Sequence, residues 1–523
     1  MKKVKCLLLI GFLCGNLSIL SGKENFSFPL EIPIQEEPSL NLNENEGEII
    51  PITEFDTKEG KWYNDVVIVS GKEYFPAIAR APGSSTKFFC VRVHFPDTLY
   101  YVRKSTNGGE SWPTAWGSVK ALYTDIAVTN EYVFVVYEWQ GNVYMKKYDH
   151  SGTYLATYTI AGTSDWEMTP SICTDAEYYS SDEWLYIVWF RDDSDAGTEV
   201  YAGVYREDGS PVYSPTRIIG SGSSSVFYFP KIAYDHPGKL HVVAWDTTQK
   251  KIIYRGATNY GGNWGSAFYF AGPPSGYIYR LPRVDAQDGR VLITWERIKS
   301  DYSEVYTSFV YSTNGGVDPG NFSSVYYFTT QYWRAIPVII NTSNKWYMVR
   351  WRYSQNKFYV NYNYSTDPGG SWYIGPDISD IGYNLLPWDS FDGITCGDNK
   401  LAVIWTDGNT HLAFDAEWRG TDIDEAFDSS YSKEFFLNFP NPIYDELVPI
   451  SFGIPKDTYI KLGIYDILGN NVCTLIDKEL KRGHYKIIWD KRNFSGQMVK
   501  SGIYFLHFNL GEHRQTKKLI ILK

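Results

Sequence analysis

A short apolar run that ends in tryptophan recurs along the middle of the chain. The runs are rich in Val, Ile, Tyr and Phe, which favours β-strands over helices. Their tryptophans follow one another at intervals of 50 to 56 residues: Trp139, Trp189, Trp245, Trp295, Trp351 and Trp405. A strand repeated at this period predicts a fold built from copies of one small sheet.

A shorter segment precedes each of these runs and is usually marked by a proline. These segments contain Pro76, Thr124, Pro170, Pro230, Pro282, Pro337 and Pro387, and the first is followed by "KFFCVRV", which has no tryptophan. Each unit also offers a tyrosine-rich strand, such as 251–257, and an outer strand, such as 266–271. A lone four-stranded sheet must stack its faces on neighbours around a ring, as the blades of a β-propeller do.

These patterns predict an all-β protein whose residues 61–425 form a seven-bladed β-propeller. The segment at 61–69 precedes the first unit and is expected to complete the last blade, which contains Trp405. Aromatic residues make up 17% of the 523 positions, with 43 Tyr and 18 Trp, which supports strands again. The length and the 43% hydrophobic content allow a large core and more than one domain.

The net charge of −11 argues against a nucleic-acid backbone or an anionic membrane surface as the main partner. The N-terminus reads as a secretory signal peptide over residues 1–22, with lysines ahead of an apolar run and small residues after it. Bulky Phe12 and Leu13 make Cys14 a poor lipid-attachment site. No later segment is long and apolar enough to cross a membrane, so the mature chain is expected to have no transmembrane segment.

Residues 23–60 are polar, acidic and rich in proline, which predicts a linker. The four cysteines beyond the signal peptide match no metal-ligand spacing: Cys90, Cys173, Cys396 and Cys473. Their wide separation favours buried free thiols over disulfides. We therefore predict no bound metal and no cofactor.

A turn motif, Ser-x-Asp/Asn-x-Gly-x-x-Trp, recurs in step with the units. Its copies are Ser105, Asn107, Gly109 and Trp112, then Ala257, Asn259, Gly261 and Trp264, then Ser365, Asp367, Gly369 and Trp372. Residues 312–319 keep the turn but lose the tryptophan. The carboxylate or amide accepts backbone N–H bonds, glycine takes a positive φ, and tryptophan packs beneath the hairpin.

This motif resembles the Asp-box, or BNR repeat, of sialidase-like β-propellers. The resemblance implies that the motif lies between the third and fourth strands of a blade, on the face opposite a binding funnel. We therefore interpret Asp367 and its counterparts as structural residues rather than catalytic ones.

The last part of the chain has a different character, with alternating strands and glycine turns over residues 436–523 that predict a β-sandwich. It carries Asn438, Pro440, Asn441 and Pro442, then Tyr465, Asp466 and Gly469, then Trp489, Asp490, Gly496, Ser501, Gly502 and Tyr504. These residues resemble the C-terminal sorting domain of type IX secretion cargo, a small immunoglobulin-like sandwich that is also similar to flagellar hook-capping proteins. The resemblance implies a bacterial protein that engages the secretion machinery and is secreted or held at the cell surface.

Three functions remain open for the propeller: a non-catalytic recognition protein, a glycoside hydrolase of sialidase type, and a structural surface protein. The enzyme hypothesis rests on Arg280 and Pro282 in "YRLP", which is similar to the arginine motif of sialidases. That motif precedes the first Asp-box in the family, whereas here it lies in the fifth unit. Other hydrolytic motifs are absent, and no catalytic residue is assigned.

Propeller ligands usually meet the face where the inner strands begin and the second strands end, which we call the binding face. Its predicted residues at the strand starts are Tyr74, Phe75, Glu167, Tyr228, Arg280, Trp333, Arg334 and Trp388. After the tryptophan strands they are Asp246, Glu296, Arg297, Arg352 and Asp407. Aromatic platforms with arginine forks suit an extracellular glycan that bears carboxylates, or an acidic peptide. The alternative is that the aromatics pack between blades and the arginines pair with Glu296 and nearby aspartates.

One acidic loop contains Asp192, Asp193, Asp195 and Glu199. It has enough oxygen atoms for a calcium ion but lacks the spacing of a known calcium loop. We interpret it as a solvated hairpin tip.

Overall fold

The computed structural model describes residues 48–49, 52–53, 65–416, 423–426 and 436–522. Within these ranges it leaves out 71, 85, 96, 110, 114, 180–181, 194–196, 221–224, 302, 341–344, 355–356, 380–382, 384–390, 396–400, 407–410, 440, 444–447, 481–482, 490, 492, 494–497 and 511–512. The described residues are all-β, with two short 3-10 turns at Asn259–Gly261 and Pro319–Asn321. The chain divides into two units, Met1–Glu417 and Trp418–Lys523.

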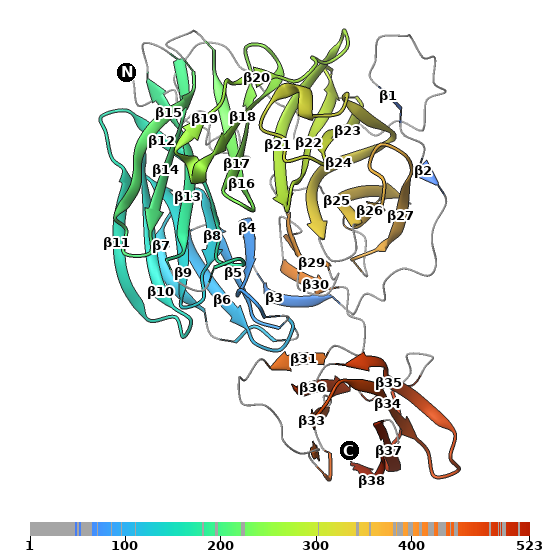
Figure 1. Ribbon diagram of the computed structural model, residues 1–523. Coiled ribbons are helices and arrows are strands. Elements are labelled where there is room, and N and C mark those ends of the chain that lie inside the picture. Colours follow the sequence, from blue (N-terminus) through green and yellow to red (C-terminus); the bar gives the residue numbers. More distant parts are fainter. Residues whose placement is uncertain are drawn as a thin grey trace. The chain divides into compact units, whose positions relative to one another are not determined.

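The strands of the first unit form antiparallel sheets, which we number in chain order (Figure 1). The first sheet holds β4 (Lys72–Arg80), β5 (Phe88–Phe95), β6 (Leu99–Ser105) and β7 (Trp116–Lys120). The second holds β8 (Thr124–Val128), β9 (Tyr132–Trp139), β10 (Asn142–Asp149) and β11 (Tyr154–Ala161). The third holds β12 (Trp166–Thr174), β13 (Trp184–Asp193), β14 (Gly197–Arg206) and β15 (Pro211–Ile219).

The later sheets continue the pattern. The fourth sheet holds β16 (Phe227–Asp235), β17 (Lys239–Asp246) and β18 (Lys251–Thr258), with short β19 (Asn263–Trp264) and β20 (Phe268–Tyr269). The fifth holds β21 (Tyr277–Gln287), β22 (Arg290–Lys299), β23 (Val305–Ser312) and the first part of β24 (Tyr326–Ile340). The sixth holds the rest of β24, β25 (Lys345–Ser354), β26 (Lys357–Ser365) and β27 (Trp372–Asp377). The seventh holds β28 (Phe391–Thr395), β29 (Leu401–Thr406), β30 (His411–Ala416) and β3 (Val66–Ser70).

The first strands of successive sheets lie against one another in a closed series. β4 packs on β8, β8 on β12, β12 on β16, β16 on β21, β21 on β24, β24 on β28, and β28 returns to β4. In Figure 1 the colours pass from sheet to sheet until orange β29 and β30 lie beside blue β3. A buried hydrogen bond spans the junction of the last and first sheets, from the Thr406 hydroxyl to the Glu73 carbonyl oxygen at 2.9 Å.

The expected closing strand is confirmed, because β3 pairs with β30 and completes the sheet that contains Trp405. The tryptophan runs are also confirmed as the second strands of their sheets. Trp189, Trp295, Trp351 and Trp405 are almost fully buried, because each fills the layer between two neighbouring sheets.

Two features differ from the expected four separate strands per unit. β24 is one strand that closes the fifth sheet through Tyr326–Gln331 pairings and then opens the sixth through the pairings of Tyr332 onward. Within the predicted linker, Glu48–Ile49 pairs in parallel with β24, and Ile52–Thr53 pairs in parallel with β27. These four residues form β1 and β2 and therefore add short strands to two sheets, whereas a linker was predicted here. Residues 1–22, the predicted signal peptide, lie outside the described residues.

The second unit contains two four-stranded sheets that share one apolar core. One sheet holds β31 (Ile423–Ala426), β36 (Gly483–Trp489), β33 (Val448–Ile454) and β32 (Phe436–Asn438). The other holds β35 (Asn471–Leu480), β34 (Thr458–Tyr465), β37 (Gly502–Leu510) and β38 (His513–Ile521). The core includes Trp489 and the inward residues of both sheets.

The predicted end of the propeller at residue 425 is corrected by this pairing. β31 pairs with β36, with Ile423 opposite Ile487, so residues 423–426 belong to the second unit. The sequence around β31 is acidic and short, and only its partner strand shows which sheet it joins. Asn441, early in the second unit, is hydrogen-bonded to the last strand, β38. Its side chain accepts from the Ile520 N–H at 3.0 Å and donates to the Lys518 carbonyl at 2.9 Å.

Candidate functional site

A bulge interrupts the first strand of several sheets at the binding face. The residue before the proline has a positive φ in four of them: Phe75, Thr169, Phe229 and Leu281, at 46 to 52°. The pairing with the second strand slips at the same place, for example between Tyr74 and Ala77. Proline has no N–H for the ladder and is tolerated at a bulge, so the proline marker predicts this break.

The bulges help to build an aromatic cluster where the first strands begin. Phe75 of the first sheet lies 4.7 Å from the Tyr123 ring, and Phe229 of the fourth sheet lies 6.5 Å from the same ring, measured between centroids. The first and fourth sheets are not neighbours in the series, so this contact crosses the middle of the ring. Met168, Phe190 and Tyr228 join the group, which we call the central cluster.

The predicted aromatic residues of the binding face divide into two groups. Tyr74, Phe75 and Tyr228 are half-buried, and Tyr228 packs edge-on against Phe190 at 5.1 Å. The structure thus brings Phe75 and Tyr228 into one cluster. The side chains of Trp333 and Arg334, and the residues Trp388 and Asp407, lie outside the described part of the chain.

The predicted arginines of the fifth sheet lie inside the protein. Arg280 is 5% exposed and donates from Nε to Glu296 Oε2 at 2.7 Å. Arg297 is buried between two tyrosine rings, 4.5 Å from the Tyr277 centroid and 4.3 Å from that of Tyr327. These two cations are therefore satisfied by groups of their own sheets.

Similar pairs occupy the same end of the other sheets. Glu167 is buried and accepts from Arg191 Nε at 2.7 Å and from the Trp189 indole N–H at 2.5 Å. Arg352 donates from Nε to Asp377 at 3.0 Å. Asp246 instead accepts from the Tyr269 hydroxyl at 2.6 Å and from the backbone N–H groups of residues 248 and 249.

Two acidic groups at this end were not singled out from the sequence. Glu73 is buried between Arg92 and His94, each at 3.0 Å, and burial raises its pKa despite both partners. Glu304 accepts hydrogen bonds from the Tyr277 and Tyr306 hydroxyls and pairs with Lys299. A signal for Glu73 does exist, because Glu73 and Glu167 both stand three residues before the proline of their units.

Glu138, at the end of β9, lacks the partners that its counterparts have. Its side chain is fully buried, its Oε1 accepts a long bond from the Gly141 N–H at 3.4 Å, and its Oε2 has no hydrogen-bond partner. Burial in this site raises the pKa of Glu138 to about 7. Glu138 therefore carries a proton over much of the acidic and neutral range.

The turn motifs lie at the opposite end of the sheets, between the third and fourth strands. Ser105 Oγ accepts from the Gly109 N–H at 2.9 Å, and Asn107 Oδ1 accepts from the Ser111 N–H at 3.1 Å. Gly109 has a φ of +96°, and a Cβ there would lie 1.8 Å from the Phe414 ring, so only glycine fits. Trp112 packs on the same ring at 5.3 Å.

The other copies keep parts of this arrangement. Asp367 Oδ1 accepts from the Gly369 N–H at 3.3 Å, the Ser365 hydroxyl accepts from the Asp367 N–H, and Trp372 is buried. The turn at Asn259, Gly261 and Trp264 has alanine at position 257 in place of serine and forms a 3-10 turn. These contacts support the structural interpretation of the motif, since each polar group serves its own turn.

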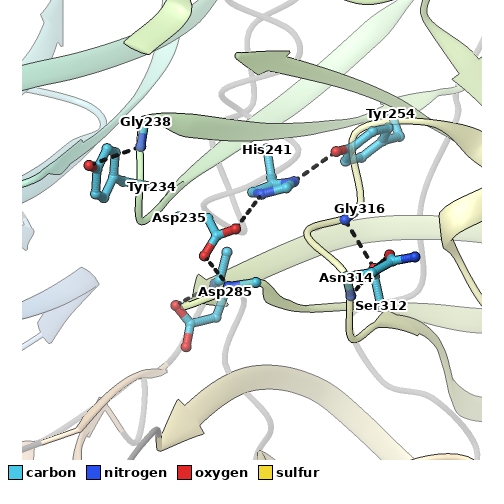
Figure 2. A network of polar contacts seen from close by, with 11 residues as sticks. Tyr234, Asp235, Gly238, His241, Tyr254, Asp285, Ser312, Asn314 and Gly316 are labelled. Atoms are coloured by element: carbon cyan, nitrogen blue, oxygen red, sulfur yellow. Dashed lines mark hydrogen bonds and ion pairs between the residues drawn. The ribbon is translucent and has the colours of Figure 1, made fainter. Parts of the chain in front are cut away.

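Figure 2 shows a buried polar network near the turn at Ser312, Asn314 and Gly316. His241 Nδ1 lies 2.7 Å from the Tyr254 hydroxyl, and His241 Nε2 lies 3.8 Å from Asp235 Oδ2. Asp235 also accepts from the Gly289 N–H of the fifth sheet at 2.8 Å. The order carboxylate, imidazole, hydroxyl is that of a proton relay, but all three side chains are fully buried and burial lowers the pKa of His241. We therefore interpret the network as a tie between two sheets.

The acidic loop gives no cation site among the described residues. Glu199 is buried and is paired with Arg217 at 2.6 Å. The side chains of Asp193 and Asp195 lie outside the described residues, and Asp192 is half-buried at the end of β13. No group of three potential metal-ligating side chains occurs in the described ranges. Cys90, Cys173 and Cys473 form no disulfide, and Cys396 lies outside the described residues.

Comparison with known families identifies the second unit. Residues 438–522 match the family described as "Secretion system C-terminal sorting domain". A comparison with curated protein sequences finds no match.

Several solved structures are similar to the chain at low identity. They include an ulvan lyase of polysaccharide lyase family PL25, an α-L-arabinanase of Penicillium chrysogenum, and PorZ, a surface component of the type IX secretion system of Porphyromonas gingivalis. Their identities are 9%, 13% and 11%, and the alignments cover 67%, 68% and 85% of this chain and 95%, 98% and 70% of theirs. The TM-scores of 0.45, 0.40 and 0.30 are too low for these likenesses to carry an argument about the site.

The family match establishes where the protein goes. A type IX sorting domain marks a chain that is delivered to the bacterial cell surface or the extracellular space. Among the described residues, none of the helices has the length and apolar character that a membrane crossing requires.

Proposed function

We propose that this exported chain is a seven-bladed, sialidase-like β-propeller with Asp-box turns, joined to an immunoglobulin-like sorting domain, and that it recognises an extracellular glycan without catalysis. The closed series of first strands and the closure by β3 support the blade count. The shared core of two four-stranded sheets supports the sandwich. The proposed binding surface is the binding face of the propeller, around the central cluster.

One observation carries the proposal: the described aromatic residues of this face are partly accessible, while its described arginines are already held by carboxylates or tyrosine rings of the protein. Tyr74, Phe75 and Tyr228 are half-buried, so each residue keeps an accessible part. Aromatic faces stack on the apolar faces of sugar rings and need no charge to do so. An arginine that is bound to a protein carboxylate has fewer donors left for a ligand carboxylate.

The same pairing weighs against a sialidase mechanism. A sialidase of the family that the turn motif resembles holds the substrate carboxylate with three arginines. Arg280 is buried and donates to Glu296, and Arg352 pairs with Asp377. Releasing either arginine for a substrate would leave a buried or half-buried carboxylate without its cation, which costs stability.

The proposal is tested by binding of the purified mature chain to an array of extracellular polysaccharides, followed by calorimetry on the strongest ligand. We expect Tyr74→Ala combined with Tyr228→Ala to weaken binding by about tenfold or more, since each lost stacking contact is worth about 1 kcal/mol. The matched control is Tyr154→Ala, because Tyr154 is an exposed tyrosine at the start of a fourth strand, at the opposite end of the sheets.

A fluorogenic glycoside panel, with sialosides included, separates the alternatives. Turnover that is abolished by Arg280→Ala would replace the recognition proposal with the sialidase hypothesis. Absence of any binding in the folded protein would favour a purely structural surface protein.

A further inference from the structure

The second unit exposes two large apolar side chains at the tip of a hydrogen-bonded turn. Ile467 and Leu468 are 69% and 81% exposed. Asp466 fixes the turn beneath them, because its Oδ1 accepts from the Leu468 N–H at 2.8 Å and from the Asn470 N–H at 2.9 Å. The two side chains are therefore held out by the backbone and not by packing.

The strands next to this turn continue the apolar surface. Ile503 of β37 and Ile520 of β38 are cross-strand partners, and Phe505 pairs with Tyr465 at the end of β34 from which the turn begins. Alternate residues of a strand point to opposite faces. Leu506, Leu519 and Ile521 lie in the core, so Ile503, Phe505 and Ile520 lie on the outer face.

We call Ile467, Leu468, Ile503, Phe505 and Ile520 the outer-face patch. Ile503 is also exposed, and Phe505 and Ile520 are half-buried. Isolated apolar residues are common on surfaces, but here one turn and two paired strands carry five accessible apolar side chains, a grouping that is typical of a binding surface.

Charge narrows the choice of partner for this patch. Residues 436–523 contain 13 Lys and Arg against 8 Asp and Glu, a net charge of +5 in a chain whose total is −11. Lys518 is the cross-strand neighbour of Phe505, so positive charge borders the patch directly. Two copies of this unit would repel each other, whereas an acidic partner would be attracted.

We propose that the outer-face patch is the surface by which the sorting domain docks on the export machinery, in an apolar pocket of an acidic protein. The fixed turn favours a pocket in a protein, because two side chains held in one geometry lose little entropy when they enter a shaped site. The proposal depends on the sorting-domain match alone and is independent of glycan recognition by the propeller.

The test uses the full chain in a bacterium whose type IX system delivers the wild-type protein to the surface. Ile467→Ser with Leu468→Ser is compared with Tyr154→Ser and Leu155→Ser, a neighbouring pair that is 53% and 46% exposed on β11 of the other unit. We expect the first double variant to reduce the surface-exposed fraction at least tenfold, with the protein retained in the periplasm. The second pair is expected to be exported as the wild type.

Three results would overturn the proposal. The first is normal export of the turn variant and of Ile503→Ser with Ile520→Ser. The second is equal loss of export in the β11 control. The third is patch-dependent sedimentation of the purified chain with phosphatidylglycerol vesicles, which would assign the patch to lipid.

A melting temperature equal to that of the wild type shows that a variant is folded. If the turn variant melts at a lower temperature, the export of the variant Ile503→Ser with Ile520→Ser is used to test the proposal. Retained glycan binding by an export-deficient variant keeps this proposal separate from the function of the propeller.

Discussion

Glu138 differs from the buried acids of neighbouring sheets because none of the described residues gives it a cationic partner. Glu73 has Arg92 and Glu167 has Arg191, whereas the Oε2 of Glu138 has no hydrogen-bond partner. A buried carboxyl in this position favours the neutral form, which is why its pKa rises to about 7. The stability of the first unit should therefore depend on pH through this residue.

Glu138→Gln tests that dependence. In the unfolded chain the carboxyl ionises near pH 4.5, but in the folded protein it stays protonated up to about pH 7. The stabilisation is present in full below pH 4.5 and is lost as the pH rises to 7, a difference of about 3 kcal/mol. We expect the unfolding free energy of the wild type to fall by about that amount relative to Glu138→Gln between pH 4.5 and 8.

Urea denaturation followed by tryptophan fluorescence at both pH values measures this change. The part of the difference in unfolding free energy that is the same at both pH values comes from the replacement of the carboxyl by an amide. The part that changes with pH comes from ionisation of the Glu138 carboxyl. If the difference were the same at pH 4.5 and pH 8, Glu138 would be ionised in the folded protein and our account of its environment would be wrong.

At the level of single residues, the sequence predicted where a side chain lies in its sheet better than which group it contacts. It placed Arg280 and Glu296 at one end of the sheets because strand starts and strand ends can be read from the repeat. It left open whether Arg280 faces a ligand or a carboxylate, since cross-strand register decides that and the bulge before Pro282 shifts the register. Glu138 carries no motif, and its isolation is visible only when all its neighbours are placed.

Among the strands, we expect β3 to matter most for the stability of the first unit, because it completes the last sheet. Its two central residues face opposite sides: Ile68 is 5% exposed within the core with Phe414, whereas Val67 is 53% exposed. This contrast offers a matched pair of substitutions on one strand.

Ile68→Asp should destabilise the first unit by about 3 to 5 kcal/mol, because it places an unpaired charge in a core. Val67→Asp should change stability by less than about 1 kcal/mol, because it adds a charge at the surface. Thermal unfolding of the two variants gives the comparison. Equal effects of the two substitutions would show that β3 is not packed in the last sheet as described.

The repeat predicted most elements because each unit must bury the same faces. Where the chain departs from the repeat, prediction was weaker. The double use of β24 depends on a continuous 15-residue strand, which no local turn residue marks. β1, β2 and β31 are short and polar, and their strand conformation comes from the edges on which they pair.

At the scale of the whole molecule, the two units have separate cores, and the sorting domain serves export. Deletion of everything after Glu417 should leave a folded propeller that stays in the periplasm. The cut belongs there and not at residue 436, where the predicted β-sandwich begins, because β31 pairs with β36 and would otherwise be left without its sheet.

Cell fractionation and surface protease digestion measure the outcome, and the melting temperature of the purified fragment shows whether the propeller is intact. Normal surface delivery of the folded fragment would refute the role of the second unit. A fragment that cannot fold would show that the propeller depends on the sorting domain.

The pairing of β3 with β30 also sets the time at which the first unit can be completed. Ser70 and His411 are register partners although 341 positions separate them in the chain. Joining such distant segments costs loop-closure entropy and slows folding relative to local hairpins. β3 precedes every other strand of the last sheet in the chain, so that sheet and the closed series of first strands stay incomplete until the chain is available up to residue 416.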